Sequence, residues 1–243
     1  MSFWPLCLKH EQSAKIIGGE YCLREIELEV WGDLACFTPP YAKVERLTYP
    51  FPTPSAARGI LSAIYMKPKE FRWQINRIEV LNPIRYISFK RNEVKSTVRA
   101  EPIFTDVERT QRQTVALQDV RYRIAASIIP RPAFVGKEAQ LYEQALRRIR
   151  GGKCYMQPSF GLRELVCYFE ESDGIRQPIE DSLDAGTMVY DLFTPEDVEI
   201  TKKANIHLSL FHAVMEHGVI QIPPYESPEV LKEEGNVNAE SSV

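Results

Sequence analysis

The chain has 243 residues, of which 44% are hydrophobic and 26% are charged, as is usual for a globular protein with a sizeable core. No apolar run approaches the roughly 18 residues that a membrane-spanning helix needs, and "FWPLCL" near the start lacks the basic flank and cleavage site of a signal peptide. We therefore expect a cytoplasmic protein with no membrane partner.

Cysteine usage and charge distribution narrow the class of protein further. The five cysteines are scattered and form no CxxC pair, so we expect no zinc site, no disulfide framework and no cofactor. Residues 65–165 carry 20 basic and 10 acidic side chains, whereas residues 166–243 carry 4 and 16. The basic segment is interleaved with aromatic residues, which favours nucleic-acid binding. The alternative is that the two segments neutralise each other across an interface.

The first third of the chain predicts an extension, a strand and a helix. Residues 1–21 show no period and are expected to be poorly ordered. Residues 24–37 alternate apolar and acidic side chains, which predicts a half-buried strand. Thr53 is a suitable N-cap and Pro54 a suitable first residue for a helix that ends before Pro68.

The middle of the chain predicts strands and a second helix. Residues 73–94 indicate one long strand or two strands bent at Pro83, and residues 95–115 indicate a basic loop. Residues 116–130 are again typical of a strand, and residues 136–152 of a helix. The inward-facing residues of this helix are expected to be Ala139, Tyr142, Ala145, Leu146 and Ile149.

A further strand is expected around residues 160–166. The resulting order, β-α-β-β-α-β, is that of the α+β ferredoxin-like (RRM-type) fold, which we assign to residues 22–166. Residues 167–228 indicate a small C-terminal antiparallel β addition, and residues 229–243 an acidic, disordered tail.

Long blocks of the sequence carry a family resemblance. "EVWGDLACFTPPYAKVERLTYPFPTPSAARGILSAIYMKP" and "GGKCYMQPSFGLREL" closely resemble the CRISPR-associated Cas-five proteins of the type I-C branch. Those proteins belong to the RAMP superfamily and have a ferredoxin-like fold. The resemblance covers residues 25–224 and depends on long ordered blocks, not on one short motif.

The resemblance implies a metal-independent endoribonuclease that cuts CRISPR precursor RNA within each repeat. The enzyme then stays on the 5′ handle as a subunit of the type I-C Cascade complex, so repeat RNA and other Cascade subunits are the implied partners. In this reaction the ribose 2′-hydroxyl attacks its own phosphodiester and leaves a 2′,3′-cyclic phosphate and a 5′-hydroxyl. It needs a base, a cation beside the developing charge and a proton for the leaving oxygen.

In the family a tyrosine, a lysine and an adjacent histidine share these tasks. The matching positions are Tyr65 in "AIYMKP", Lys137 in "GKE" and Glu138, which occupies the place of the histidine. Either Glu138 serves as the base, or the chain is a structural handle-binding subunit with slow or absent cleavage. Without the family, Tyr65 would be typical of a core residue with a solvated hydroxyl, and Glu138 of a favourable charge at a helix N-terminus.

Basic residues and a glycine pair complete the predicted RNA-binding site. Gly151 and Gly152 resemble the glycine-rich loop of RAMP proteins, whose amides approach phosphate, although such a pair after a helix is also typical of a C-cap. Duplex DNA is a more distant alternative partner for the same basic segment. The predicted RNA-binding residues are Lys67, Arg85, Arg91, Arg121, Arg123, Gly151, Gly152 and Lys153.

Overall fold

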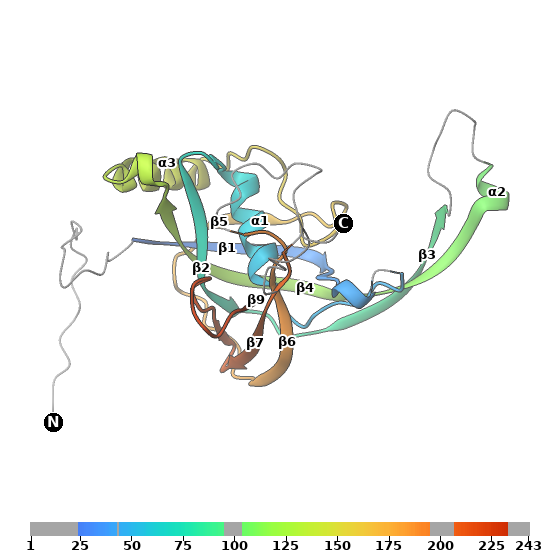
Figure 1. Ribbon diagram of the computed structural model, residues 1–243. Coiled ribbons are helices and arrows are strands. Elements are labelled where there is room, and N and C mark those ends of the chain that lie inside the picture. The colour runs from blue at the N-terminus through green and yellow to red at the C-terminus, as the bar shows by residue number, and fades with distance from the viewer. Residues whose placement is uncertain (1–23, 43, 95–103, 195–206, 233–243) are drawn as a thin grey trace, which may run out of the picture.

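The computed structural model describes residues 24–42, 44–94, 104–194 and 207–232 (Figure 1). In these residues no helix is long and apolar enough to cross a membrane. The helices are α1 (Pro54–Ile64), α2 (Thr105–Glu108) and α3 (Glu138–Arg150), with 3-10 turns at Pro40–Ala42 and Pro132–Phe134. The strands are β1 (Glu25–Ala35), β2 (Phe71–Val80), β3 (Tyr86–Val94), β4 (Arg109–Pro130), β5 (Tyr168–Glu171), β6 (Leu183–Asp191), β7 (Ser209–Glu216), β8 (Val219–Gln221) and β9 (Leu231–Lys232).

A single antiparallel sheet connects the strands of the described residues. Its order is β5-β1-β4-β2-β8-β7-β6, with β3 paired to β4 and β9 paired to β7. The C-terminal strands join this sheet where β8 pairs with β2, so the predicted antiparallel addition continues the first sheet and does not form one of its own. The mixed class of helices and antiparallel strands is confirmed.

Helices α1 and α3 pack against the same hydrophobic core. Side chains alternate along a strand, and the core-facing set of β1 and β4 includes Leu28 and Ile124, which are fully buried. As predicted, α1 begins after Thr53, whose hydroxyl accepts a hydrogen bond from the Ala56 amide at 3.1 Å. The apolar side of α3 consists of Leu141, Ala145, Leu146 and Ile149. The expected burial of Ala139 is wrong, because this residue lies on the solvent side of the first turn.

The strand β3 and the first half of β4 form a two-stranded ribbon that extends away from α3 (Figure 1). Pairing runs from Tyr86↔Leu117 to Val94↔Arg109, and we call these paired residues the arm. The chain breaks between β2 and β3 around Pro83, so of the two alternatives left open by the sequence the pair of strands is the one observed. The loop expected over residues 95–115 is wrong from Thr105 onward, because Thr105–Glu108 form α2 and the residues from Arg109 pair with β3 as the start of β4. Residues 95–103 lie outside the described residues.

The strand expected at residues 160–166 is also wrong. These residues form turns, and the strand that pairs with β1 is β5, a few residues later. Gly161 gives the physical reason, since it has a φ of +83° and a Cβ there would lie 2.0 Å from the carbonyl oxygen of Cys36. The neighbouring Phe160 is fully buried, and its carbonyl accepts from the Cys36 amide at 3.1 Å. A long-range packing contact therefore shapes this segment.

The two ends of the chain fall largely outside the described residues. The predicted N-terminal extension, residues 1–21, lies outside them, as do residues 233–243 of the predicted tail. Within that tail, Leu231–Lys232 form β9, which pairs with β7.

We expect Gly161→Ala to lower the free energy of unfolding by about 3 kcal/mol. A side chain there adds a steric clash, which costs about 1–3 kcal/mol, to left-handed backbone strain of about 1–2 kcal/mol. The matched control is Gly174→Ala, because Gly174 has a φ of +71° with nothing within 4 Å of the added Cβ, and should lose about 1 kcal/mol. Urea unfolding measures both, and equal losses would contradict the close approach to Cys36.

Candidate functional site

Tyr65 is fixed where α1 meets the sheet and α3. It caps the C-terminus of α1, and its N–H donates to the carbonyl of Leu61 at 2.9 Å. Its ring is 3% exposed and stacks on Phe71 of β2, with 5.1 Å between ring centroids. Its carbonyl accepts from the indole Nε1 of Trp73 at 3.0 Å. The ring thus belongs to the core, and only the hydroxyl remains for chemistry.

The hydroxyl of Tyr65 lies among polar and charged groups. It donates a hydrogen bond to Oε1 of Gln144 on α3, at 2.9 Å. Burial raises the pKa of Tyr65, and the nearby charges of Lys67 and Arg148 offset this effect only in part. The phenol therefore stays protonated near neutral pH, which makes it a proton donor and not a base.

Two cations flank this phenol. The amine of Lys67 lies 2.9 and 3.1 Å from the two carboxylate oxygens of Glu70. That hydrogen bond is the main cause that raises the pKa of Lys67, and the neighbouring Tyr65 also contributes. The guanidinium of Arg148 lies 5.9 Å from the centre of the Tyr65 ring, and its Nε donates to the carbonyl of Ile64 at 3.1 Å. The structure therefore places two predicted site residues, Tyr65 and Lys67, together.

A cavity of about 540 Å³ opens along α3 beside the phenol. Gln144 both lines this cavity and accepts the hydrogen bond of Tyr65, so one residue connects the cavity to the phenol. These side chains were not among the site residues predicted from the sequence. Their only signal is their spacing on the polar side of a helix, which is equally typical of a solvated surface. The lining residues are Gln140, Glu143, Gln144 and Arg147.

Lys137 and Glu138 lie at the N-terminus of α3. Lys137 is exposed at the N-cap position, and its amine lies 5.0 Å from the centre of the Phe134 ring. Glu138 is the first residue of the helix, and its Oε1 accepts from the amide of Gly136 at 2.9 Å. One carboxylate oxygen of Glu138 thus closes the turn that leads into the helix.

The phenol and Lys137 lie along one side of α3, not in contact with each other. Lys137 precedes Gln144, the partner of Tyr65, by seven residues, which is two helical turns and about 10 Å along the axis. Residues separated by two turns share a helix face. Glu138, six residues before Gln144, is offset from that side by about a third of a turn, so the three predicted catalytic residues do not form one compact cluster.

The predicted RNA-binding arginines of β4 are held in ion pairs on the face of the sheet opposite the helices. Nη1 of Arg121 lies 2.5 Å from Oε1 of Glu29. Nη1 of Arg123 lies 2.5 Å from Oε2 of Glu79. Arg123 is buried and also donates to the hydroxyl of Ser172 and the carbonyl of Arg176. Because both guanidinium groups are neutralised within the fold, they stabilise the sheet and present little free positive charge.

The glycine pair forms a helix cap. The amide of Gly152 donates to the carbonyl of Ile149 at 3.0 Å, and the amide of Lys153 donates to that of Arg148 at 2.9 Å. Gly152 has a φ of +59°. This bonding is a Schellman motif, so these amides already have acceptors, while the side chain of Lys153 is exposed.

The remaining predicted RNA-binding residues belong to the region of the arm. Arg85 precedes β3 and is exposed. Arg91 lies in β3, and its Nη1 is 2.6 Å from Oε1 of Glu164. This hydrogen bond lowers the pKa of Glu164. Arg91 therefore connects the arm to the turn region 160–166, and of these two arginines Arg85 is the more exposed.

Comparison with known proteins relates most of the chain to one group. Residues 25–223 match the Cas5d family model, described as CRISPR-associated protein Cas5. A CRISPR pre-crRNA endoribonuclease Cas5d of Thermus thermophilus is 38% identical over 226 residues, 88% of this chain and 98% of the relative. A protein of the same name from Mannheimia succiniciproducens is 36% identical over 231 residues, 85% of this chain and 98% of the relative.

Two solved structures share the fold. One is described as a CRISPR-associated protein and matches with a TM-score of 0.62 and 23% identity, over 86% of this chain and 97% of the other. A functionally uncharacterized protein from Streptococcus mutans matches with a TM-score of 0.60 and 24% identity, over the same shares. At these identities the likeness shows the fold alone.

The fold, with its antiparallel sheet and two covering helices, is one that a CRISPR-associated protein also has. Because the family model and both relatives span most of its length, the chain belongs to the Cas5d family. The predicted resemblance over residues 25–224 is confirmed.

We expect Tyr65→Phe and Gln144→Ala to be coupled by about 1 kcal/mol in the free energy of unfolding, because a hydrogen bond contributes about 0.5–1.5 kcal/mol. A double-mutant cycle in urea measures this coupling. The control pairs Tyr65→Phe with Glu143→Ala, since Glu143 adjoins Gln144 but faces Arg24 at 3.7 Å. Equal coupling in the two cycles would contradict the bond between the phenol and Gln144.

Proposed function

We propose that this protein is a metal-independent endoribonuclease that cleaves CRISPR precursor RNA within its repeat. It then remains on the 5′ handle as a subunit of the type I-C Cascade complex. The names of its curated relatives, pre-crRNA endoribonucleases, support the substrate and the reaction. The observation that carries the proposal in this chain is the protonated hydroxyl of Tyr65, oriented by Gln144 at 2.9 Å beside the cation of Lys67.

The fold that we propose for the catalytic unit is ferredoxin-like. Its four strands have the spatial order β5-β1-β4-β2, with α1 between β1 and β2 and α3 between β4 and β5. This arrangement supports a β-α-β-β-α-β unit, into which the arm is inserted between the second and third strands. Both helices then place their ends, at Tyr65 and Lys137, on one side of the sheet.

The proposed reaction is an internal transesterification. The ribose 2′-oxygen forms a bond to phosphorus while the bond from phosphorus to the 5′-oxygen breaks, which leaves a 2′,3′-cyclic phosphate and a 5′-hydroxyl. The 2′ proton passes to Glu138, and Tyr65 supplies the proton of the leaving oxygen. Lys137 neutralises the charge that develops on the phosphate oxygens.

A structural handle-binding subunit without turnover is a second candidate. Two observations favour it over the enzyme. Glu138 stands where the family resemblance implies a histidine, and one of its oxygens already accepts from Gly136. Tyr65 and Lys137 are also separated by about two turns of α3, so RNA has to bring its scissile phosphate to both.

We expect the purified protein to cut a repeat stem-loop RNA once in the presence of EDTA and to leave a cyclic phosphate. Gel electrophoresis of the RNA detects the cut, and resistance of the new 3′ end to phosphatase identifies the cyclic phosphate. RNA that is bound but uncut would instead support the structural candidate.

Tyr65→Phe should slow single-turnover cleavage by roughly 100-fold or more, because a positioned proton donor contributes about 10²–10⁴-fold. Lys137→Ala should slow it by a similar factor.

The control for Tyr65→Phe is Tyr142→Phe, since the hydroxyl of Tyr142 on α3 donates to the carbonyl of Glu25 instead. Its cleavage rate should stay within twofold of the wild-type rate. Because burial raises the pKa of Tyr65 above the usual 10.0, the wild-type rate should not fall as pH rises from 7 to 9. An alkaline decline in that range would contradict the assignment of Tyr65 as the acid.

We expect Glu138→His to show whether the carboxylate at this position acts as the base or impairs the chemistry. If the carboxylate is the base, the substitution lowers the cleavage rate at pH 7, and the loss is largest below the ordinary histidine pKa of about 6.5. Single-turnover kinetics from pH 5.5 to 8 measures the rate. A rise in rate would show that the carboxylate impairs the chemistry and would exclude Glu138 as the base.

A further inference from the structure

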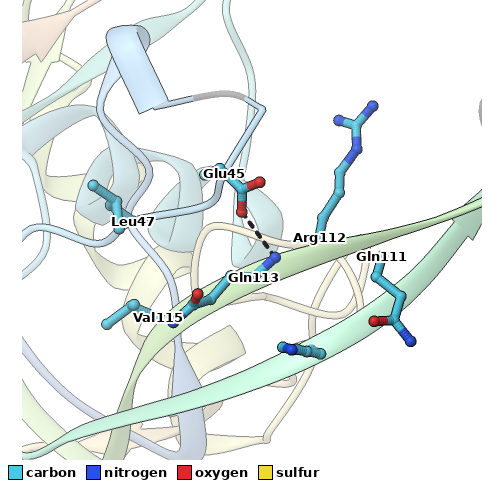
Figure 2. Close-up of a pocket in the computed structure, with 7 residues that line it drawn as sticks. Glu45, Leu47, Gln111, Arg112, Gln113 and Val115 are labelled. Carbon is cyan, nitrogen blue, oxygen red and sulfur yellow. Dashed lines mark hydrogen bonds between the residues drawn. The ribbon is translucent and has the colours of Figure 1, made fainter.

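A second cavity, of about 510 Å³, lies on the arm, at the opposite end of β4 from α3. It lies where the chain before α1 passes beside β4 (Figure 2). Arg112 contributes to its rim but leaves the strand in the opposite direction from Gln111 (Figure 2). The other lining residues are Glu45, Leu47, Lys90, Gln111, Gln113 and Val115.

The wall of this cavity is pre-formed by backbone hydrogen bonds. The amide of Arg46 donates to the carbonyl of Gln113 at 3.2 Å, and the amide of Val115 donates to the carbonyl of Arg46 at 2.8 Å. The amide of Gln113 donates to Oε2 of Glu45 at 2.8 Å (Figure 2). The segment that carries Glu45 and Leu47 is thus bonded along the edge of β4 that does not pair with β3, and these bonds hold the wall of the cavity in place.

The side chains of the cavity have three different chemical characters. Lys90 pairs in register with Gln113, is exposed, and forms no ion pair within the part of the chain that the structure describes. Leu47 is 43% exposed although it is apolar. Gln111 is exposed on the same face of the ribbon as Gln113, because side chains alternate along a strand. The cation of Lys90 suits the phosphate of a nucleotide, and the apolar side chain of Leu47 suits the face of its base. The amide of Gln111 suits the hydrogen-bonding edge of the base.

Glu45 adds a means of selecting the base. Its Oε2 accepts from the Gln113 amide, so Oε1 remains as a hydrogen-bond acceptor on a residue that lines the cavity. A carboxylate accepts from the exocyclic amine of cytosine, adenine or guanine, whereas uracil has no amine and offers only its N3–H, between two carbonyl oxygens that repel a carboxylate. Two acceptors that face each other repel, and neither of them gains a hydrogen bond. The cavity should therefore favour a base that carries an amine.

We propose that this cavity binds one unpaired nucleotide of the RNA and selects against uracil. The phosphate contacts Lys90, the base packs against Leu47 and Val115, and its exocyclic amine donates to Glu45. A volume of about 510 Å³ is within the roughly 300–1,000 Å³ usual for small-ligand pockets. The inference depends on the proposed RNA substrate, but it concerns binding and not cleavage.

The selection is tested by equilibrium binding of stem-loop RNAs whose unpaired flanks are all cytosine or all uracil. Wild type should bind the cytosine form roughly tenfold more tightly, as one base-edge contact of this kind allows. Glu45→Gln keeps an acceptor for the Gln113 amide but replaces the other oxygen with an amine, so it should remove or reverse the preference. No preference in wild type, or an unchanged preference in Glu45→Gln, would overturn the proposal.

The phosphate contact is tested separately with Lys90→Ala. The affinity should fall roughly tenfold, and the slope of log K against log salt should become shallower by about 0.7, as for one phosphate contact on a single strand. The control is Arg163→Ala, which removes one charge from an exposed position outside the cavity and should change the affinity less than twofold. Equal losses would show a general electrostatic effect and overturn the contact.

These measurements distinguish the failure of this proposal from that of the proposed enzyme. Binding that shows the base preference without any cleavage would leave the pocket in place and remove the catalytic function. Cleavage without the base preference would remove the proposed pocket and leave the catalytic function in place.

Discussion

The rest of the structure depends on the pairing of one strand, β4, with neighbours on both of its edges. Its C-terminal half lies between β1 and β2, and its N-terminal half pairs with β3. On its other edge the N-terminal half bonds to Arg46. Because a shift of one residue would turn every side chain to the opposite face, one register fixes the core, the charged face and the cavity on the arm together.

The register of β4 also decides what its arginines do. Arg123 lies opposite Glu29 on β1 and Glu79 on β2, and it bonds to Glu79. Removing one partner of such a buried pair leaves an uncompensated charge, which is strongly destabilising. The excess of basic residues in the middle of the sequence therefore overstates the free positive surface, since part of it is neutralised across the sheet.

Local patterns in the sequence predicted the local structure well. Thr53 and Pro54 mark the start of α1, the alternation at residues 24–37 marks β1, and the break at Pro83 separates β2 from β3. The errors arose where distant contacts decide. Gly161 turns because it packs on Cys36, and no pattern within a short window of sequence contains that contact.

The candidate site likewise contains residues that the sequence predicted and partners that it could not. Tyr65 was recognised through the family resemblance, and its position at the end of α1 follows from the helix signals around it. Its partner Gln144 could not be predicted, because 79 positions separate them in the chain and a glutamine on a polar helix face carries no distinguishing signal. The pairing of Arg121 with Glu29 was hidden for the same reason, since it depends on strand register.

The arrangement along α3 constrains how any cleavage would proceed. The phenol of Tyr65 is protonated, so it fits the departure of the 5′-oxygen, and the base must lie elsewhere. Glu138 and Lys137 are about two turns away along the helix, which exceeds the reach of a single hydrogen bond. Tyr65 and Lys137 can contact the same scissile phosphate only if bound RNA places that phosphate within reach of both. Such positioning of the reacting groups is a large part of catalysis. Under the proposed function, tight binding and cleavage are therefore separable, because RNA can be held on the protein without its scissile phosphate reaching both Tyr65 and Lys137.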